Sequence, residues 1–212
     1  MIKLPEKIRI GAGEYKVIGG KDTENEYVGY HDYCNQIIKI AEYAKGEKRN
    51  DLAILETILH ECIHGISSNW LPSDLSEDIV TALSTTLFGL FAHNNLMLTN
   101  KKFPDKVVYN GFIYKVIYPI PKSVDMDEFE YFSTTNDNVC KIFITKDHGN
   151  SVVAIKTLFL KTAMKLAMKL SNAFTDKEIE EIYNTCFYQG LYQVLVDNKL
   201  DTLIYKTYKR ML

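Results

Sequence analysis

The residues best suited to chemistry lie in one short stretch, residues 59–65, which read LHECIHG. This is an HExxH motif. Four residues are just over one turn of an α-helix, so His60 and His64 project from the same face and can share one Zn²⁺ ion. Glu61 lies beside them, where it can take a proton from water and later deliver it to a leaving amine. The motif predicts metal-assisted hydrolysis; the alternative is that both histidines are ordinary helix-surface or core residues.

A catalytic zinc site normally has three protein ligands, so a third ligand must be found. Glu77 is the expected one, because it begins a second helical stretch after a turn rich in serine and asparagine. A second helix that returns antiparallel brings its start close to the motif. Two alternatives stay open: Asp78 is the ligand instead, or Glu77 only completes a capping box with Asp74, at the Asp74-x-x-Glu77 spacing, and neither acidic residue binds the metal.

The motif must be held by a helix, and the apolar pattern around it predicts one. Leucine and isoleucine recur at three-and-four spacing from Leu52 to Ile66, which describes one apolar helix face. A second helix is expected over residues 77–95. Before the helices, glycines at 11 and 13 indicate a hairpin turn, and residues 27–30 and 36–41 are expected to form strands.

The second half of the chain repeats the first. Residues 5–18 (PEKIRIGAGEYKVI) align without gaps with residues 104–117 (PDKVVYNGFIYKVI), with six identical positions. Another strand is expected over 139–144, an acidic loop over 125–130 and a turn over 136–138. Helices are expected over 152–170 and about 177–198, the second opening with a capping box at Thr175-x-x-Glu178. Aligning Leu59 with Leu160 replaces the three motif residues, so the second copy is expected to lack zinc ligands and base; the replacements are Lys161, Thr162 and Lys165.

These elements predict an α+β fold built from two homologous lobes, each a small, mainly antiparallel sheet followed by two helices. Residues 1–100 are expected to form the lobe that carries the HExxH motif, and residues 101–212 a degenerate second copy without the metal motif. The boundary near residues 99–102 is short, so the lobes are expected to pack on each other. Four lysines at helical spacing suggest a basic face on the second copy, or simply a solvated one: Lys156, Lys161, Lys165 and Lys169.

Composition narrows the partners and the location. The 25 basic and 27 acidic side chains give a formal charge of −2, so neither nucleic acid nor a membrane is expected as a partner. No apolar run approaches the roughly 20 residues that span a bilayer, and no signal peptide is recognisable. A cytoplasmic location is therefore expected. The widely spaced cysteines are expected to be reduced core residues; they are Cys34, Cys62, Cys140 and Cys186.

Three segments together carry a family resemblance: residues 4–18, residues 54–66 (ILETILHECIHGI) and residues 75–94 (LSEDIVTALSTTLFGLFAHN). They resemble the small HExxH proteins of bacteriophages and prophages, which are similar to the ImmA/IrrE-like and minigluzincin metallopeptidases. The resemblance covers roughly the first 100 residues. It implies that His60, His64 and Glu77 hold zinc and that Glu61 is the catalytic base. The duplication is a departure, because the family's usual unit is a single copy.

Two functions follow as hypotheses. The first is a zinc-dependent, phage-encoded metallopeptidase that acts in the bacterial cytoplasm on a protein or peptide, such as a host or phage regulatory protein. The second is a non-catalytic binding protein, zinc-stabilised or metal-free, that captures a host protein or a small ligand. The degenerate second copy motivates the second hypothesis, since it keeps the fold signals without the chemistry.

Overall fold

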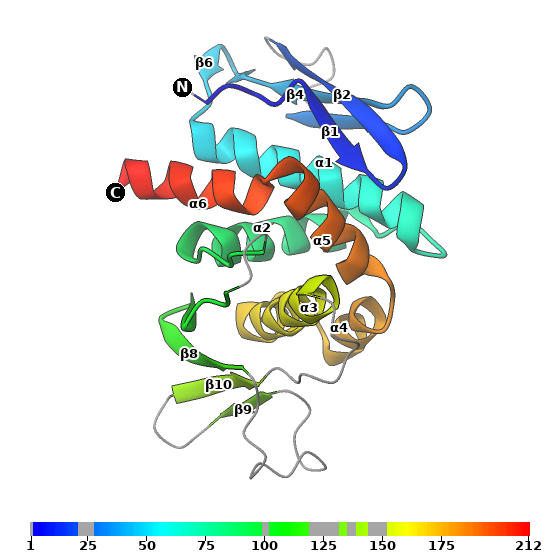
Figure 1. Ribbon diagram of the computed structural model, residues 1–212. Coiled ribbons are helices and arrows are strands. Elements are labelled where there is room, and N and C mark those ends of the chain that lie inside the picture. Colours follow the sequence, from blue (N-terminus) through cyan, green and yellow to red (C-terminus); the bar gives the residue numbers. More distant parts are fainter. Residues whose placement is uncertain (1, 21–27, 99–101, 119–131, 135–138, 144–151) are drawn as a thin grey trace.

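The computed structural model describes residues 2–20, 28–98, 102–118, 132–134, 139–143 and 152–212. In this part of the chain, a layer of helices lies between two small sheets, one at each end of the molecule (Figure 1). The predicted α+β class is confirmed. The expected acidic loop at 125–130 and the expected turn at 136–138 lie outside the described residues, as do residues 99–101 of the expected boundary.

The first sheet covers the helix that carries the HExxH motif. Its order is β1-β2-β4-β3, with β2 and β4 parallel and the other two pairs antiparallel. Ile8 and Ile10 alternate with exposed residues along β1 and point into the core, as a half-buried strand requires. β3 is the edge strand on the motif side. The strands are β1 (Lys7–Ile10), β2 (Gly13–Gly20), β3 (Gly29–Asp32) and β4 (Ile37–Ala41), followed by the short hairpin β5 (Tyr43–Ala44) and β6 (Glu47–Lys48).

Two helices follow this sheet and run antiparallel. α1 (Asp51–Trp70) begins at Asn50, whose side chain accepts a hydrogen bond from the backbone N–H of Ala53. α2 (Glu77–His93) begins at Ser76, whose side chain accepts from the backbone N–H of Ile79.

The expected capping box between Asp74 and Glu77 is wrong. Ser76 caps α2 instead, and Asp74 accepts a hydrogen bond from the Ser68 hydroxyl at 2.9 Å. The Glu77 carboxylate therefore takes no part in capping the helix that it begins.

The second half repeats the strand pattern of the first. Its sheet has the order β7-β8-β10-β9, again with one parallel pair, β8 with β10, between antiparallel ones. The strands are β7 (Lys106–Tyr109), β8 (Phe112–Ile117), β9 (Phe132–Thr134) and β10 (Val139–Phe143). The helix that follows, α3 (Val152–Ser171), has the same 20-residue length as α1.

The single helix expected over about 177–198 is wrong, because the chain forms α4 (Asp176–Tyr183) and α5 (Phe187–Asn198) there, and then α6 (Leu200–Met211). The expected Thr175 capping box of α4 is present. The break coincides with Thr185, whose hydroxyl donates to the carbonyl of Ile182 and accepts from the backbone N–H of Phe187. Such side-chain bonds compete with the continuing helix.

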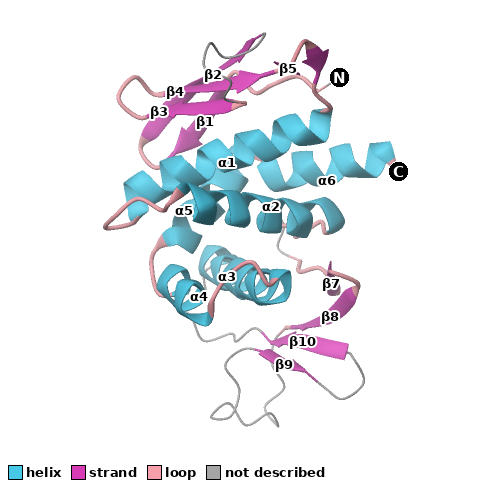
Figure 2. Cartoon of the chain, turned by 180° about the vertical axis from the view of Figure 1, so that it is seen from behind, coloured by secondary structure: helices cyan, strands magenta, loops and turns pink. Residues whose placement is uncertain are grey.

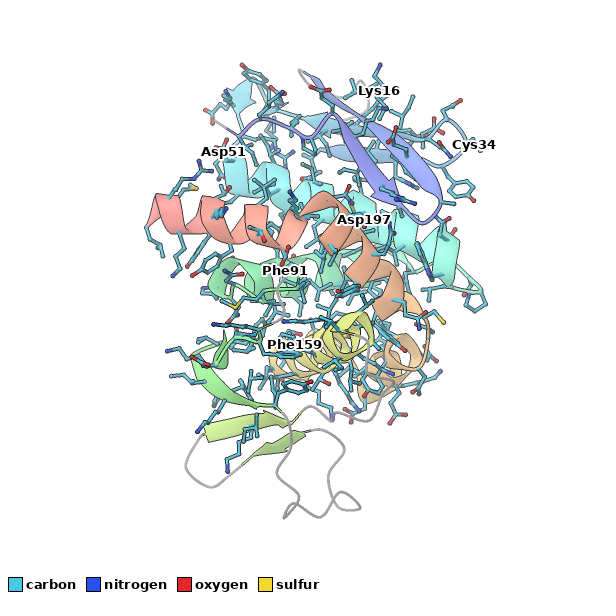
Figure 3. The ribbon with its side chains drawn as sticks, in the orientation of Figure 1. Lys16, Cys34, Asp51, Phe91, Phe159 and Asp197 are labelled. Carbon is cyan, nitrogen blue, oxygen red and sulfur yellow. The ribbon has the colours of Figure 1, made fainter. Side chains whose placement is uncertain are left out.

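The helices of both halves share one hydrophobic core. α5 packs on α1 and β1, and α6 packs on α2, so the end of the chain returns to the first half (Figures 1 and 2). Phe91 of α2 and Phe159 of α3 lie inside the same helical layer and belong to one continuous buried cluster (Figure 3). The expected division into two lobes at residue 100 is therefore not confirmed, although the two sheets share their topology.

The expected basic face on α3 is absent from the described structure. Lys156 is fully buried and donates hydrogen bonds to the carbonyls of Met97, at 3.0 Å, and Lys102. Lys161 and Lys165 lie over tyrosine rings, and only Lys169 of the row is exposed.

The cysteine expectation is confirmed only in part. Cys62 is free and buried, but Cys34 and Cys186 are free and exposed instead of lying in the core. The Cys140 side chain lies outside the described residues. Among the residues that are described, no helix has both the length and the apolar character needed to cross a membrane.

Lys156 should make stability depend on pH in a defined direction. Burial lowers the pKa of its ammonium to about 8, whereas an unfolded lysine titrates near about 10.4. Between these values the unfolded chain binds more protons at this position, so this residue's contribution to the free energy of unfolding rises with pH. We expect the difference in that free energy, wild type minus Lys156→Met, to grow from pH 8 to pH 10 in urea titrations. A difference that is constant or falls would contradict the burial of this charge.

Candidate metal centre

Two histidine nitrogens meet on one face of α1. His60 and His64 stand one turn apart, and their Nε2 atoms lie 3.1 Å from each other. Both side chains are half-buried against the start of α2. This is the juxtaposition that the HExxH spacing predicts for a shared ion.

Glu77 completes the cluster from the first residue of α2. One carboxylate oxygen, Oε1, lies 3.0 Å from His60 Nε2, and the other, Oε2, lies 3.1 Å from His64 Nε2. The Glu77 side chain is 68% exposed, so the cluster faces solvent on this side. A carboxylate in the first turn also interacts favourably with the positive end of the helix dipole.

The turn between the helices sets this position. The backbone N–H of Leu75 donates to the hydroxyl of Ser67 at 2.7 Å, and Ser68 donates to Asp74, so both serines at the end of α1 bind the segment that leads into α2. The sequence analysis identified this segment as a turn but assigned Asp74 to the helix cap instead of to Ser68.

The three side chains could hold a metal ion. Two ligand atoms about 2.0–2.1 Å from a tetrahedral zinc ion lie about 3.3 Å from each other. The two histidine nitrogens lie 3.1 Å apart, and each lies 3.0 or 3.1 Å from a different Glu77 oxygen, distances that are also ordinary for hydrogen bonds. Two imidazole nitrogens with one carboxylate oxygen also match a donor set of catalytic zinc sites, which leave the fourth position open. In the described part of the chain, these residues form the group of three that could hold a metal: His60, His64 and Glu77.

Asp78, the alternative ligand, is not part of this group. It lines a separate cavity of about 490 Å³ together with residues such as Tyr109 and Ala173. Neighbouring positions on a helix point about 100° apart, so only one of two consecutive acidic residues can face the histidines. The structure brings Glu77 to the cluster and directs Asp78 toward the second half.

His60 is held in the form that binds metals. Burial lowers its pKa, an effect that the nearby Glu77 carboxylate opposes. The neutral imidazole, which has a free lone pair, is the form that ligates zinc. On the other side of the ring, the Ser84 hydroxyl of α2 lies 3.5 Å from Nδ1.

Glu61 lies next to the cluster and is only 5% exposed. Burial, followed by the charge of Glu77, raises the pKa of its carboxyl group to about 8. A cation held by the neighbouring ligands would favour the charged carboxylate and so oppose this rise. Glu61 and His60 line a cavity of about 370 Å³ that also contacts Val28 and Gly29 of the edge-strand region.

Gly29 makes room for Glu61, and the sequence analysis missed it. A Cβ atom at Gly29 would lie 2.2 Å from Glu61 Oε1 and 2.5 Å from Thr57 Cγ2. The strand can therefore pass this close to α1 only because residue 29 has no side chain. An isolated glycine in a predicted strand is a sign of such close approach, and that signal was available at 27–30.

Arg49 was also missed, and no sequence signal marks it. Its guanidinium donates to the carbonyls of Ala41 at 2.8 Å and Ala53 at 3.0 Å, and to the hydroxyl of Thr57 at 2.6 Å. These bonds join the end of β4 to the first turns of α1. Arg49 thus fixes the helix that carries the motif against the sheet.

The second copy has the predicted replacements. Lys161 and Lys165 occupy the positions in α3 that His60 and His64 occupy in α1, counted from the first residue of each helix. Their ammonium groups lie over the ring of Tyr183, at 4.0 and 4.2 Å from its centroid.

The chain was compared with protein-family models, with curated proteins and with solved structures, and nothing matches in any of the three. The chemical interpretation of the centre therefore rests on its geometry.

The choice of third ligand can be tested by exchanging carboxylates for amides. We expect Glu77→Gln to weaken zinc binding by about tenfold or more, because an amide oxygen carries no charge toward the ion. Asp78→Asn, which makes the same change at the next residue, should leave the affinity within about twofold. Competition with a chromophoric chelator measures the zinc affinities of both variants. The reverse order of effects would identify Asp78 as the ligand.

Gly29→Ala should disturb the site without touching a ligand. The added methyl group has to displace the Glu61 carboxyl or the strand, at a cost of about 1–3 kcal/mol in the free energy of unfolding. Gly20→Ala is the matched control, because a Cβ there meets nothing within 4 Å. In urea unfolding, Gly29→Ala should have a clearly lower free energy of unfolding than Gly20→Ala. Equal free energies of unfolding would show that β3 does not approach Glu61 this closely.

Proposed function

We propose that this chain is a zinc-dependent metallopeptidase that hydrolyses a peptide bond in a protein or peptide. The observation that carries the proposal is the convergence of three ligand atoms beside a buried carboxyl group. His60 Nε2, His64 Nε2 and one Glu77 oxygen can hold the ion, while Glu61 lies in the adjoining cavity. His60 and Glu77 of the cluster line this cavity together with Glu61.

Each residue then has a defined task. Zinc, when bound, supplies Lewis acidity to a carbonyl group and lowers the pKa of water. The neutral imidazoles of His60 and His64 and the Glu77 carboxylate hold the ion. Glu61 accepts the proton of the attacking water and delivers it to the leaving amine. Its low exposure keeps bulk water from competing for that proton.

The neighbouring edge strand supports a peptide as substrate. β3 pairs with β4 on one side only, and its other side has no partner strand among the described residues. An extended peptide can add to such an edge through main-chain hydrogen bonds. Val28, Tyr30 and Tyr33 are exposed apolar or aromatic side chains along this edge, and Val28 also lines the cavity that holds Glu61.

The wider setting is part of the same proposal and follows the family resemblance. We infer a phage-encoded protein that acts in the bacterial cytoplasm, with a host or phage regulatory protein as substrate.

A cleavage assay with a trapped base tests the proposal. Zinc-loaded wild type is incubated with short synthetic peptides of randomised sequence, and products are detected by mass spectrometry. We expect Glu61→Gln to reduce cleavage by about 100-fold or more while retaining zinc, since loss of a general base typically costs this much. Glu180→Gln, an exposed change on α4, should cleave as the wild type does.

Two results would count against a peptidase. Cleavage by Glu61→Gln at the wild-type rate would remove Glu61 from the mechanism. A wild type that holds zinc and binds peptides without cutting them would favour the non-catalytic binding protein instead.

A further inference from the structure

A second cavity lies in the other half of the molecule, away from the histidines. It is formed between α3 and α5 and has a volume of about 850 Å³. This volume is within the range of about 300–1,000 Å³ that small-molecule sites occupy. The lining residues are Val153, Ala154, Thr157, Leu158, Lys161, Tyr183, Tyr188, Gln189, Tyr192, Gln193, Val196 and Asp197.

The walls of this cavity are mainly apolar. On α3, the lining residues recur at three-and-four spacing and include Ala154 and Leu158; on α5, they include Tyr192 and Val196. All four are half-buried. Two helix faces therefore leave an apolar channel between them instead of closing on each other.

One end of the cavity carries a cation. The Lys161 ammonium lies 4.0 Å from the ring centroid of Tyr183 and 4.5 Å from that of Tyr188. Burial, and then the charge of Lys165, lowers the pKa of Lys161. Among the described residues, no carboxylate forms an ion pair with Lys161, whose ammonium lies over the two rings and interacts with Lys165 and Cys186. A half-buried ammonium in this state attracts an anion.

The other end carries an acid whose charge is already compensated. Asp197 forms an ion pair with Arg9 at 3.8 Å and accepts a hydrogen bond from Gln193. It lies nine residues after Tyr188 on the same helix, which corresponds to about 13 Å along the axis. The cavity is therefore polarised, with its uncompensated positive charge at the Lys161 end.

Corresponding positions of the repeated helices α1 and α3 carry different chemical groups. At the positions where α1 presents two imidazoles to a cation, α3 presents two ammonium groups. Of these two lysines, Lys161 lines the cavity, so a helical position that holds a candidate metal ligand in the first half holds a cation in the second.

We propose that this cavity binds a small amphipathic carboxylate, with its head group at Lys161 and its apolar chain between α3 and α5. The ammonium supplies the charge and the hydrogen-bond donors, and the rings of Tyr183 and Tyr188 orient it. The chain of the ligand lies against Leu158, Tyr192 and Val196. A single head group and one apolar body account for both the polarity and the size of the cavity.

Calorimetric titration of the full chain with decanoate tests this proposal, with decanol as the uncharged probe of the same length. We expect decanoate to bind at least about tenfold more tightly than decanol, because a charge-assisted hydrogen bond is worth that much. Lys161→Met should remove this preference by weakening decanoate alone. Lys169→Met, on the exposed side of the same helix, should keep it.

A second variant distinguishes loss of the binding site from a folding defect. Ala154→Phe places a ring in the cavity and leaves Lys161 in place, so it should weaken decanoate and decanol alike, while circular dichroism reports the helices. Equal binding of decanoate and decanol by the wild type, unchanged decanoate binding by Lys161→Met, or no binding of either probe would overturn the proposal.

Discussion

Two imidazole nitrogens 3.1 Å apart, both facing one carboxylate, form a group that could hold a metal ion. Lone pairs directed at a common point repel each other unless a proton or a metal ion lies between them. Burial disfavours the proton on His60, and Glu61 adds another carboxyl group beside it. A divalent ion satisfies all of these groups at once. The packing of α1, α2 and β3 holds His60, His64, Glu61 and Glu77 close together.

This packing depends on parts of the chain far from the motif. α1 is fixed on one side by the sheet, through the guanidinium of Arg49, and on the other by α2, α5 and α6. Asn198, near the C-terminus, donates to the carbonyl of Arg9 at 3.0 Å and accepts from its backbone N–H at 2.9 Å. The second half therefore supports the first, and it keeps the repeated sheet topology, while Lys161 of α3 lines a different kind of cavity.

Local patterns predicted most of the elements and the centre of the site. The apolar periodicity identified α1 and α3, and the histidine spacing identified the side of α1 that faces Glu77, because both depend on helix geometry alone. The break at Thr185 was missed, since side-chain competition with the backbone leaves little trace in periodicity. Lys156 was expected to be solvated. It is buried, because the carbonyl groups of Met97 and Lys102, which are distant in the sequence, accept its hydrogen bonds. Gly29 was a visible sign of close approach in a predicted strand, but the strand alone does not tell which residue of α1 it approaches.

The most direct test of the central claim is a crystal structure of zinc-loaded protein, with anomalous diffraction recorded on both sides of the zinc absorption edge. We expect one zinc peak about 2.0–2.2 Å from His60 Nε2, His64 Nε2 and a Glu77 oxygen, with a fourth position left open. A zinc-loaded crystal without a peak between α1 and the start of α2, or with zinc bound only elsewhere, would contradict it.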